Sequence, residues 1–111
     1  MNGVSFSVIA EQAIEELLEA MEEIEEMDNC DLDLVDGVLT IVFEDGGQII
    51  INRQEPVKQL WLASPFGPAH FDMVDNGKSW TDDKTGEDLI EVLGRALSQK
   101  LGTTVSLDLP G

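Results

Sequence analysis

Carboxylates are the residues of this sequence with the clearest capacity for chemistry. Between positions 11 and 36, Asp and Glu occur twelve times, with no Lys or Arg among them. Carboxylate oxygens are hard ligands that suit iron, manganese, magnesium and calcium, and a dense carboxylate surface concentrates cations around it. The segment therefore indicates a cation-binding surface. The alternative interpretation is a solvated face that only keeps the protein soluble.

Apolar residues in the same segment predict that a helix carries these acids. They recur at three- and four-residue intervals, the spacing of one face of an α-helix, at Phe6, Ile9, Ala10, Ala13, Ile14, Leu17, Met21 and Ile24. We expect the helix to begin near Ser5 or Ser7 and to end around residues 27–29. Its opposite face carries one row of acids, Glu11, Glu15, Glu19, Glu22 and Glu26. Because exposed side chains on a helix are not a preorganised cage, cation binding here is expected to be weak and multi-site.

The remaining composition argues against several other classes of function. One histidine and one cysteine, His70 and Cys30, cannot supply a nucleophile, base and acid, and no glycine-rich phosphate loop precedes a helix. Asp31, Asp33 and Asp36-Gly37 lack the spacing of an EF-hand calcium loop. The chain has 111 residues with 23 acidic and 6 basic side chains, and its net charge of −17 argues against binding nucleic acid or an anionic membrane. We assign no catalytic residue.

Beyond the first helix the apolar period changes to two, which is typical of β-strands. A strand is expected around Leu32 and Leu34, and further strands at 38–44, 48–52, 57–63, 70–74 and 78–81, with turns at Asp36-Gly37, Asp45-Gly46-Gly47 and Asn76-Gly77. A second amphipathic helix follows a capping box at Thr85 and Asp88 and ends at Gly102. The tail, with Val105, Leu107 and Leu109, is either a last strand or an apolar strap.

These elements predict an α+β fold. Two helices, N- and C-terminal, each have one apolar face, and the sheet between them in sequence has one apolar face as well. The simplest packing is a two-layer sandwich with both helices on one face of a five- to six-stranded antiparallel sheet. The length predicts a single domain over residues 1–111.

The other face of this sheet is expected to meet solvent. If Leu39, Ile41 and Phe43 point inward, strand alternation directs Asn52, Gln54, Gln59 and Trp61 outward. A tryptophan among amides on a flat sheet is a plausible hot spot for a partner protein. A register slipped by one residue would place Trp61 in the core instead. His70 lies at the start of the next expected strand, near the same face.

Residues 52–63, with the sequence NRQEPVKQLWLA, closely resemble the central signature of the frataxin family, including its bacterial CyaY-type members. The resemblance continues over nearly the whole chain, through Ser64-Pro65, Gly67-Pro68, His70-Phe71-Asp72 and Trp80, and back through residues 36–40. The acidic first helix and the order of elements also match, so the resemblance implies a frataxin-like fold.

The same resemblance implies a role in iron–sulfur cluster assembly. Frataxins bind ferrous and ferric iron weakly, and by position the ligands are Glu15, Glu16, Glu19, Glu22, Glu23, Glu25, Glu26, Asp31 and Asp33. We call these nine carboxylates the acidic ridge. Family members also bind a cysteine desulfurase and a scaffold protein, and the matching sheet residues are Asn52, Gln54, Trp61 and His70.

The implied function is therefore an iron-binding adaptor or regulator, or an iron chaperone, of cluster assembly. Two alternatives stay open: a ferroxidase or iron-storage protein, and a regulator that binds only proteins while metal binding is incidental. The implied state is a monomer, with iron-driven oligomers reported for some family members.

The expected compartment is the bacterial cytoplasm. No Lys or Arg precedes Arg53, so a basic secretory start is absent, and no apolar run approaches the length of a membrane span. A single cysteine fits a reducing compartment. A mature mitochondrial form is the alternative.

Overall fold

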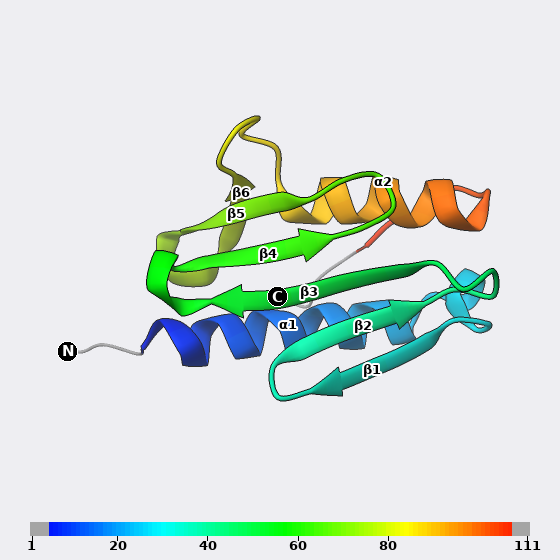
Figure 1. The fold of residues 1–111 in the computed structure, drawn as a ribbon, viewed down its shortest axis with the longest axis horizontal. Coiled ribbons are helices and arrows are strands. Elements are labelled where there is room, and N and C mark those ends of the chain that lie inside the picture. Colours follow the sequence, from blue (N-terminus) through cyan, green and yellow to red (C-terminus); the bar gives the residue numbers. More distant parts are fainter. Residues whose placement is uncertain (1–4, 108–111) are drawn as a thin grey trace.

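The helices and strands form two layers in the computed structural model, which describes residues 5–107 (Figure 1). The elements in chain order are α1 (Phe6–Glu22), η1 (Glu25–Met27), β1 (Asp31–Val35), β2 (Val38–Val42), β3 (Gln48–Gln54), η2 (Glu55–Val57), β4 (Gln59–Ala63), β5 (Ala69–Val74), η3 (Asp75–Gly77), β6 (Ser79–Asp82) and α2 (Leu89–Leu101). All six strands pair antiparallel with their sequence neighbours, in the order β1-β2-β3-β4-β5-β6. Both helices pack on one face of this sheet, which confirms the predicted α+β sandwich.

The core lies between the helices and the inner face of the sheet. Leu39 on β2 pairs with Ile51 on β3, which pairs with Leu62 on β4, and all three side chains are buried. The helices close the core from the other side with Ala10, Ile14, Leu17, Met21, Leu93 and Leu97. The predicted alternation of the strands is therefore correct, and it decides which side chains lie on the outer face.

Tight turns join the strands where the sequence predicts them. Between β1 and β2, Asp36 and Gly37 both have positive φ, 52° and 76°. This is the conformation of a type I′ turn, which favours Asp-Gly because glycine adopts positive φ without strain. A Cβ at Gly37 would collide with the guanidinium group of Arg53, so a side chain there would displace that group.

The first helix is shorter than predicted, and this is a correction. It ends at Glu22, Ile24 is extended, and residues 25–27 form a separate 3-10 turn, so Glu26 does not continue the helical row of acids. Two physical causes favour the break. Acids at a helix C-terminus are repelled by the negative end of the helix dipole. The break also turns Met27 inward, where it is buried.

The start of the second helix and the tail also differ in detail from the prediction. Thr85 does not cap the helix; Asp88 is the N-cap, and its carboxylate accepts a hydrogen bond from the Ile90 amide at 2.9 Å. The helix ends at Leu101, and Gly102 caps it in the left-handed conformation, as predicted. Val105 is buried and its amide donates to the Ser98 hydroxyl at 2.9 Å, so the tail is an apolar strap, while Leu109 lies outside the described residues.

Several strand boundaries shift by one or two residues as well. The fourth strand begins at Gln59, because residues 55–57 form the 3-10 turn η2. Ser5 is the N-cap of α1, but its side chain makes no capping hydrogen bond. Within the described residues, no helix has the length and apolar character needed to cross a membrane.

Candidate functional site

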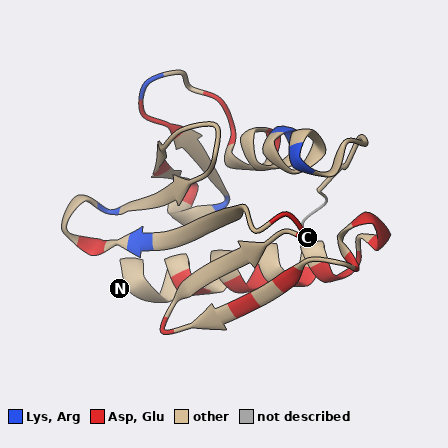
Figure 2. Cartoon of the chain, turned by 45° about the vertical axis from the view of Figure 1, so that its right-hand side comes forward, with Lys and Arg blue, Asp and Glu red and all other residues tan. Residues whose placement is uncertain are grey.

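The acidic ridge follows α1, the turn after it and the edge strand β1. Eight of its nine carboxylates belong to exposed residues, and Glu16 is half-buried. The apolar face of α1 holds the helix against the sheet, which directs Glu15, Glu19 and Glu22 toward solvent. On β1, Leu32 and Leu34 pack against the core, so alternation directs Asp31 and Asp33 outward. Figure 2 shows the resulting gathering of acidic residues over these three elements.

Basic side chains do not neutralise the acidic ridge. Among residues 5–107, none of its nine carboxylates has a Lys, Arg or His nitrogen within 4.0 Å. The neighbouring Glu11 does pair, with Arg53 at 3.0 Å. The other cations lie on the loops and on α2 (Figure 2). The ridge therefore keeps its negative potential, which attracts cations and positively charged protein surfaces.

Among the described residues, the acidic ridge holds no preformed chelate. In the described part of the chain, no three His, Cys, Asp or Glu side chains lie close enough together to hold one metal ion. Burial raises the pKa of the Cys30 thiol, and the charges of Glu44 and Asp31 raise it further, so this residue stays protonated and is a poor metal ligand. The available ligands are therefore separate carboxylates on a convex surface.

The second candidate surface is the outer face of the sheet. The strand register places Asn52 on β3 opposite Trp61 on β4, and Trp61 opposite His70 on β5. Three of the four predicted partner-binding residues thus form one row across neighbouring strands. The fourth, Gln54, pairs with Gln59 and lies two residues further along the same face.

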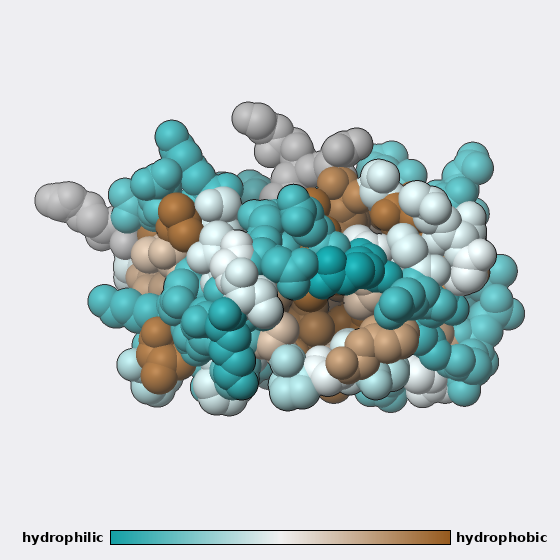
Figure 3. Space-filling model, turned by 90° about the horizontal axis from the view of Figure 1, so that it is seen from above, coloured by the Kyte–Doolittle hydropathy of each residue, from teal (hydrophilic) through white to brown (hydrophobic). Residues whose placement is uncertain are grey.

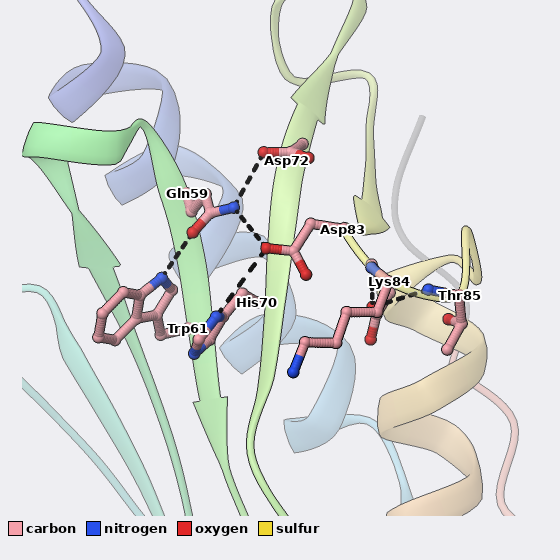
Figure 4. Close-up of polar contacts among 8 residues, drawn as sticks. Gln59, Trp61, His70, Asp72, Asp83, Lys84 and Thr85 are labelled. Atoms are coloured by element: carbon pink, nitrogen blue, oxygen red, sulfur yellow. Dashed lines mark hydrogen bonds and ion pairs between the residues drawn. The ribbon is translucent and has the colours of Figure 1, made fainter.

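The indole of Trp61 is half-buried on this outer face and is not part of the core. One of its faces stacks on the His70 ring, with 4.3 Å between ring centroids and 20° between the planes. Its N–H donates a hydrogen bond to Oε1 of Gln59 at 2.8 Å. Figure 4 shows both contacts. These two contacts orient the Trp61 side chain at the surface.

The sequence of the chain decides its family. Residues 1–103 match the profile of the frataxin-like domain. The chain belongs to the frataxin family. It is 50% identical over 107 residues to the iron-sulfur cluster assembly protein CyaY of Thioalkalivibrio sulfidiphilus, an alignment that covers 96% of this chain and all of that protein. The resemblance seen in residues 52–63 is therefore confirmed.

Solved frataxin structures share the fold of this family member. Frataxin from Psychromonas ingrahamii superposes with a TM-score of 0.74 at 30% identity, covering 93% of this chain and 97% of that one. Trimeric frataxin from the yeast Saccharomyces cerevisiae, in complex with ferrous iron, superposes with a TM-score of 0.73 at 30% identity, covering 93% and 91%.

Sequence reasoning missed part of the outer face of this frataxin. The amide nitrogen of Gln59 donates to the carboxylates of Asp72 and Asp83, each at 3.0 Å. Alternation along β5 could have placed Asp72 on this face. Asp83, in contrast, lies in the loop after β6, and no local pattern predicts that it reaches a residue 24 positions away. Figure 4 shows how it approaches Gln59 and His70.

A hollow of about 270 Å³ lies between α2 and the loop after β4. Apolar side chains such as Val92 and Phe66 line it together with polar ones such as Arg95. Figure 3, which views this side of the molecule, shows apolar surface as small patches within a largely hydrophilic surface. None of the predicted site residues lines this hollow, and we assign it no role.

Proposed function

We propose that this chain is an iron-binding adaptor and regulator of iron–sulfur cluster assembly. Ferrous or ferric iron is the cargo, held weakly at several places along the acidic ridge. The outer sheet face, with the ridge, docks the cysteine desulfurase and the scaffold protein. The observation that carries the proposal is the ridge itself, nine carboxylates with no described cationic side chain within 4.0 Å.

The chemistry of the ridge suits transient iron binding. Iron accepts hard carboxylate oxygens, and the unneutralised charge raises its local concentration. Separate surface carboxylates bind less tightly than a closed cage, because each ion must order its own ligands. Cargo that must be passed on requires such weak binding. The names of the relatives support this assignment: one is an iron-sulfur cluster assembly protein, and another was crystallised with ferrous iron.

The outer face suits a protein partner. Trp61 offers a large aromatic surface beside the amides of Asn52 and Gln59, in a row held by strand pairing. Aromatic residues of this kind contribute strongly to binding when a partner removes them from water. The ridge adds long-range attraction to a basic partner, which accelerates the encounter and makes it salt-dependent.

The test is sulfide production by the desulfurase and scaffold, with and without this protein, at several iron concentrations. We expect wild type to change the rate in an iron-dependent manner. The double variant Glu19→Gln/Glu22→Gln should lose much of that dependence, because two ridge charges are gone. The matched control Asp75→Asn/Glu91→Gln removes two exposed acids outside the ridge and should behave as wild type. A rate that is the same with and without the protein at every iron concentration would refute the proposal.

A second candidate is a regulator that binds proteins only, with incidental metal binding. It is favoured by the absence, among the described residues, of any three-ligand cluster for a metal ion. In that case the protein would change the sulfide rate equally at every iron concentration, while added salt would weaken its complex with the desulfurase. The same assay therefore separates the two candidates.

A further inference from the structure

Four side chains, from β4, from β5 and from the loop after β6, form one hydrogen-bonded network on the outer face (Figure 4). The Trp61 N–H donates to Gln59 Oε1 at 2.8 Å. Gln59 Nε2 then donates to Asp72 Oδ1 and to Asp83 Oδ2, each at 3.0 Å. The amide of Gln59 thus connects the indole to both carboxylates.

The two carboxylates fix which way the Gln59 amide points. An ionised carboxylate only accepts hydrogen bonds, so it binds the NH₂ end of the amide and repels the oxygen end. Both hydrogens of the NH₂ group of Gln59 are used, one for Asp72 and one for Asp83. The oxygen must then face the Trp61 N–H. If the amide turned over, two carboxylates would meet an oxygen and the indole N–H would meet a donor.

Asp83 is itself held in place by the loop that carries it. Its backbone N–H donates to the His70 carbonyl at 2.9 Å, which attaches it to β5. The preceding residue, Asp82, accepts hydrogen bonds from the amides of Lys84 and Thr85 at 2.7 and 3.1 Å. The same Asp83 oxygen that binds Gln59 lies 4.0 Å from Nδ1 of His70, the ring stacked on the indole. Asp83 therefore faces both the Gln59 amide and the His70 ring, the two groups that contact the Trp61 indole.

We propose that Asp72 and Asp83 are positioning residues for Trp61 in partner binding. They act through Gln59, which aligns the indole N–H, while His70 supports one face of the ring. A partner then meets an aromatic surface whose orientation is set in advance, and less conformational entropy is lost on binding. This inference rests on the proposed function, because it needs Trp61 to contact the partner.

The first test needs no partner. The solvent exchange of the Trp61 indole N–H is measured by NMR, with the resonance assigned by its loss in Trp61→Phe. In Asp72→Ala/Asp83→Ala, the exchange should become about tenfold faster, since the amide is free to turn and the indole loses its acceptor. Asp72→Asn/Asp83→Asn keeps an oxygen at each position and should restore part of the protection. Unchanged exchange in the alanine double variant would overturn the proposal.

The second test measures the affinity for the desulfurase and scaffold complex. The alanine double variant should bind several-fold more weakly, while its ferrous-iron shifts on α1 stay as in wild type. The control Glu44→Ala/Glu91→Ala loses the same charge outside the network and should match wild type in both assays. Weaker binding with unchanged indole exchange would overturn positioning, because the aspartates would then act directly.

A different measurement, the affinity of Trp61→Ala for the partner complex, tests the proposed function itself. If Trp61→Ala binds the partner complex as tightly as wild type, the outer face takes no part in docking and that part of the proposed function is wrong. The indole exchange in the free protein still decides whether the two carboxylates orient Trp61.

Discussion

Asp88 caps the start of α2 with its side chain. Its carboxylate accepts a hydrogen bond from the Ile90 amide, one of the helix donors that lack a partner within the helix. We expect Asp88→Ala to lower the free energy of unfolding by about 1 kcal/mol, the usual value of an N-cap. Urea unfolding followed by circular dichroism measures this loss.

Thr85→Ala is the matched control for this cap. Thr85 accepts a hydrogen bond from the Glu87 amide, but it is exposed and lies before the helix. Its removal should cost less than about 0.5 kcal/mol. Equal losses for both variants would contradict the assignment of Asp88 as the cap.

Glu87 and Arg95 form a pair whose charge state can be followed with pH. Two hydrogen bonds, at 2.9 and 3.2 Å, hold the pKa of the Glu87 carboxyl below its usual value, and the charge of Arg95 adds to this. The pair stabilises the fold above the ordinary carboxyl pKa, and this contribution is lost as pH falls through the lowered value. In Arg95→Gln, we expect the pKa of Glu87 to rise, as measured by NMR titration of its side chain.

Asp45 provides the internal control for that titration. A hydrogen bond from Lys100, with one from the Gly47 amide, lowers the pKa of its carboxyl. Because Lys100 remains in Arg95→Gln, the Asp45 titration should not move. A shift of both carboxyls would mean a global change of structure.

At the scale of elements, α1 carries like charges where opposite charges would stabilise it. Glu19 lies four residues from Glu15 and from Glu23, and each such repulsive pair costs roughly 0.2–0.5 kcal/mol. Glu19→Lys turns both repulsions into attractions. We expect the free energy of unfolding to rise by roughly 0.5–1 kcal/mol at low salt, while iron-induced NMR shifts on α1 decrease.

Glu91→Lys on α2 is the opposite control. Glu91 lies four residues before Arg95, so the substitution replaces attraction by repulsion and should lower stability at low salt. If Glu19→Lys lowers the free energy of unfolding as well, the prediction that repulsion between the ridge carboxylates destabilises α1 is wrong.

The stability of the hairpin between β1 and β2 is expected to depend on the close approach of Arg53 to Gly37 as well as on the turn geometry. Gly37 and Gly46 both have positive φ, 76° and 90°, so alanine at either site costs about 1–2 kcal/mol in the backbone. Only at Gly37 would the new methyl group collide with Arg53, whose guanidinium pairs with Glu11 on α1. Thermal unfolding should show Gly37→Ala to be less stable than Gly46→Ala. Equal melting temperatures would contradict a role for the Arg53 contact.

Local patterns in the sequence predicted the sheet well, for physical reasons. Leu39, Ile41 and Phe43 alternate along β2 and just after it and are buried, so this strand can bury only one of its faces. The turn at Asp36-Gly37 then sets which residues of β1 and β2 lie opposite each other. The end of α1 was predicted wrongly, because the apolar spacing of Ile24 and Met27 also fits a tighter turn that buries Met27. The contact of Asp83 with Gln59 depends on the folded sheet, and no periodicity encodes it.

At the scale of the whole molecule, the two candidate surfaces are supported by different parts of one sandwich. The acidic ridge runs along α1 and the edge strand β1, whereas Trp61 lies on β4, in the interior of the sheet order, and on its outer face. Substitutions on one surface therefore leave the contacts of the other intact. This separation allows the ridge charges and the contacts of Trp61 to be altered one at a time.

The most direct test of the central claim is an anaerobic titration of the whole protein with ferrous iron, followed residue by residue in NMR spectra. We predict shifts and broadening along α1 from Glu15 onward, in residues 25–27 and on β1, while α2 is unaffected. The variant Asp75→Asn/Glu91→Gln should show the same pattern as wild type, and Glu19→Gln/Glu22→Gln a weaker one. No localised change at millimolar iron, or changes centred on α2, would contradict iron binding at the acidic ridge.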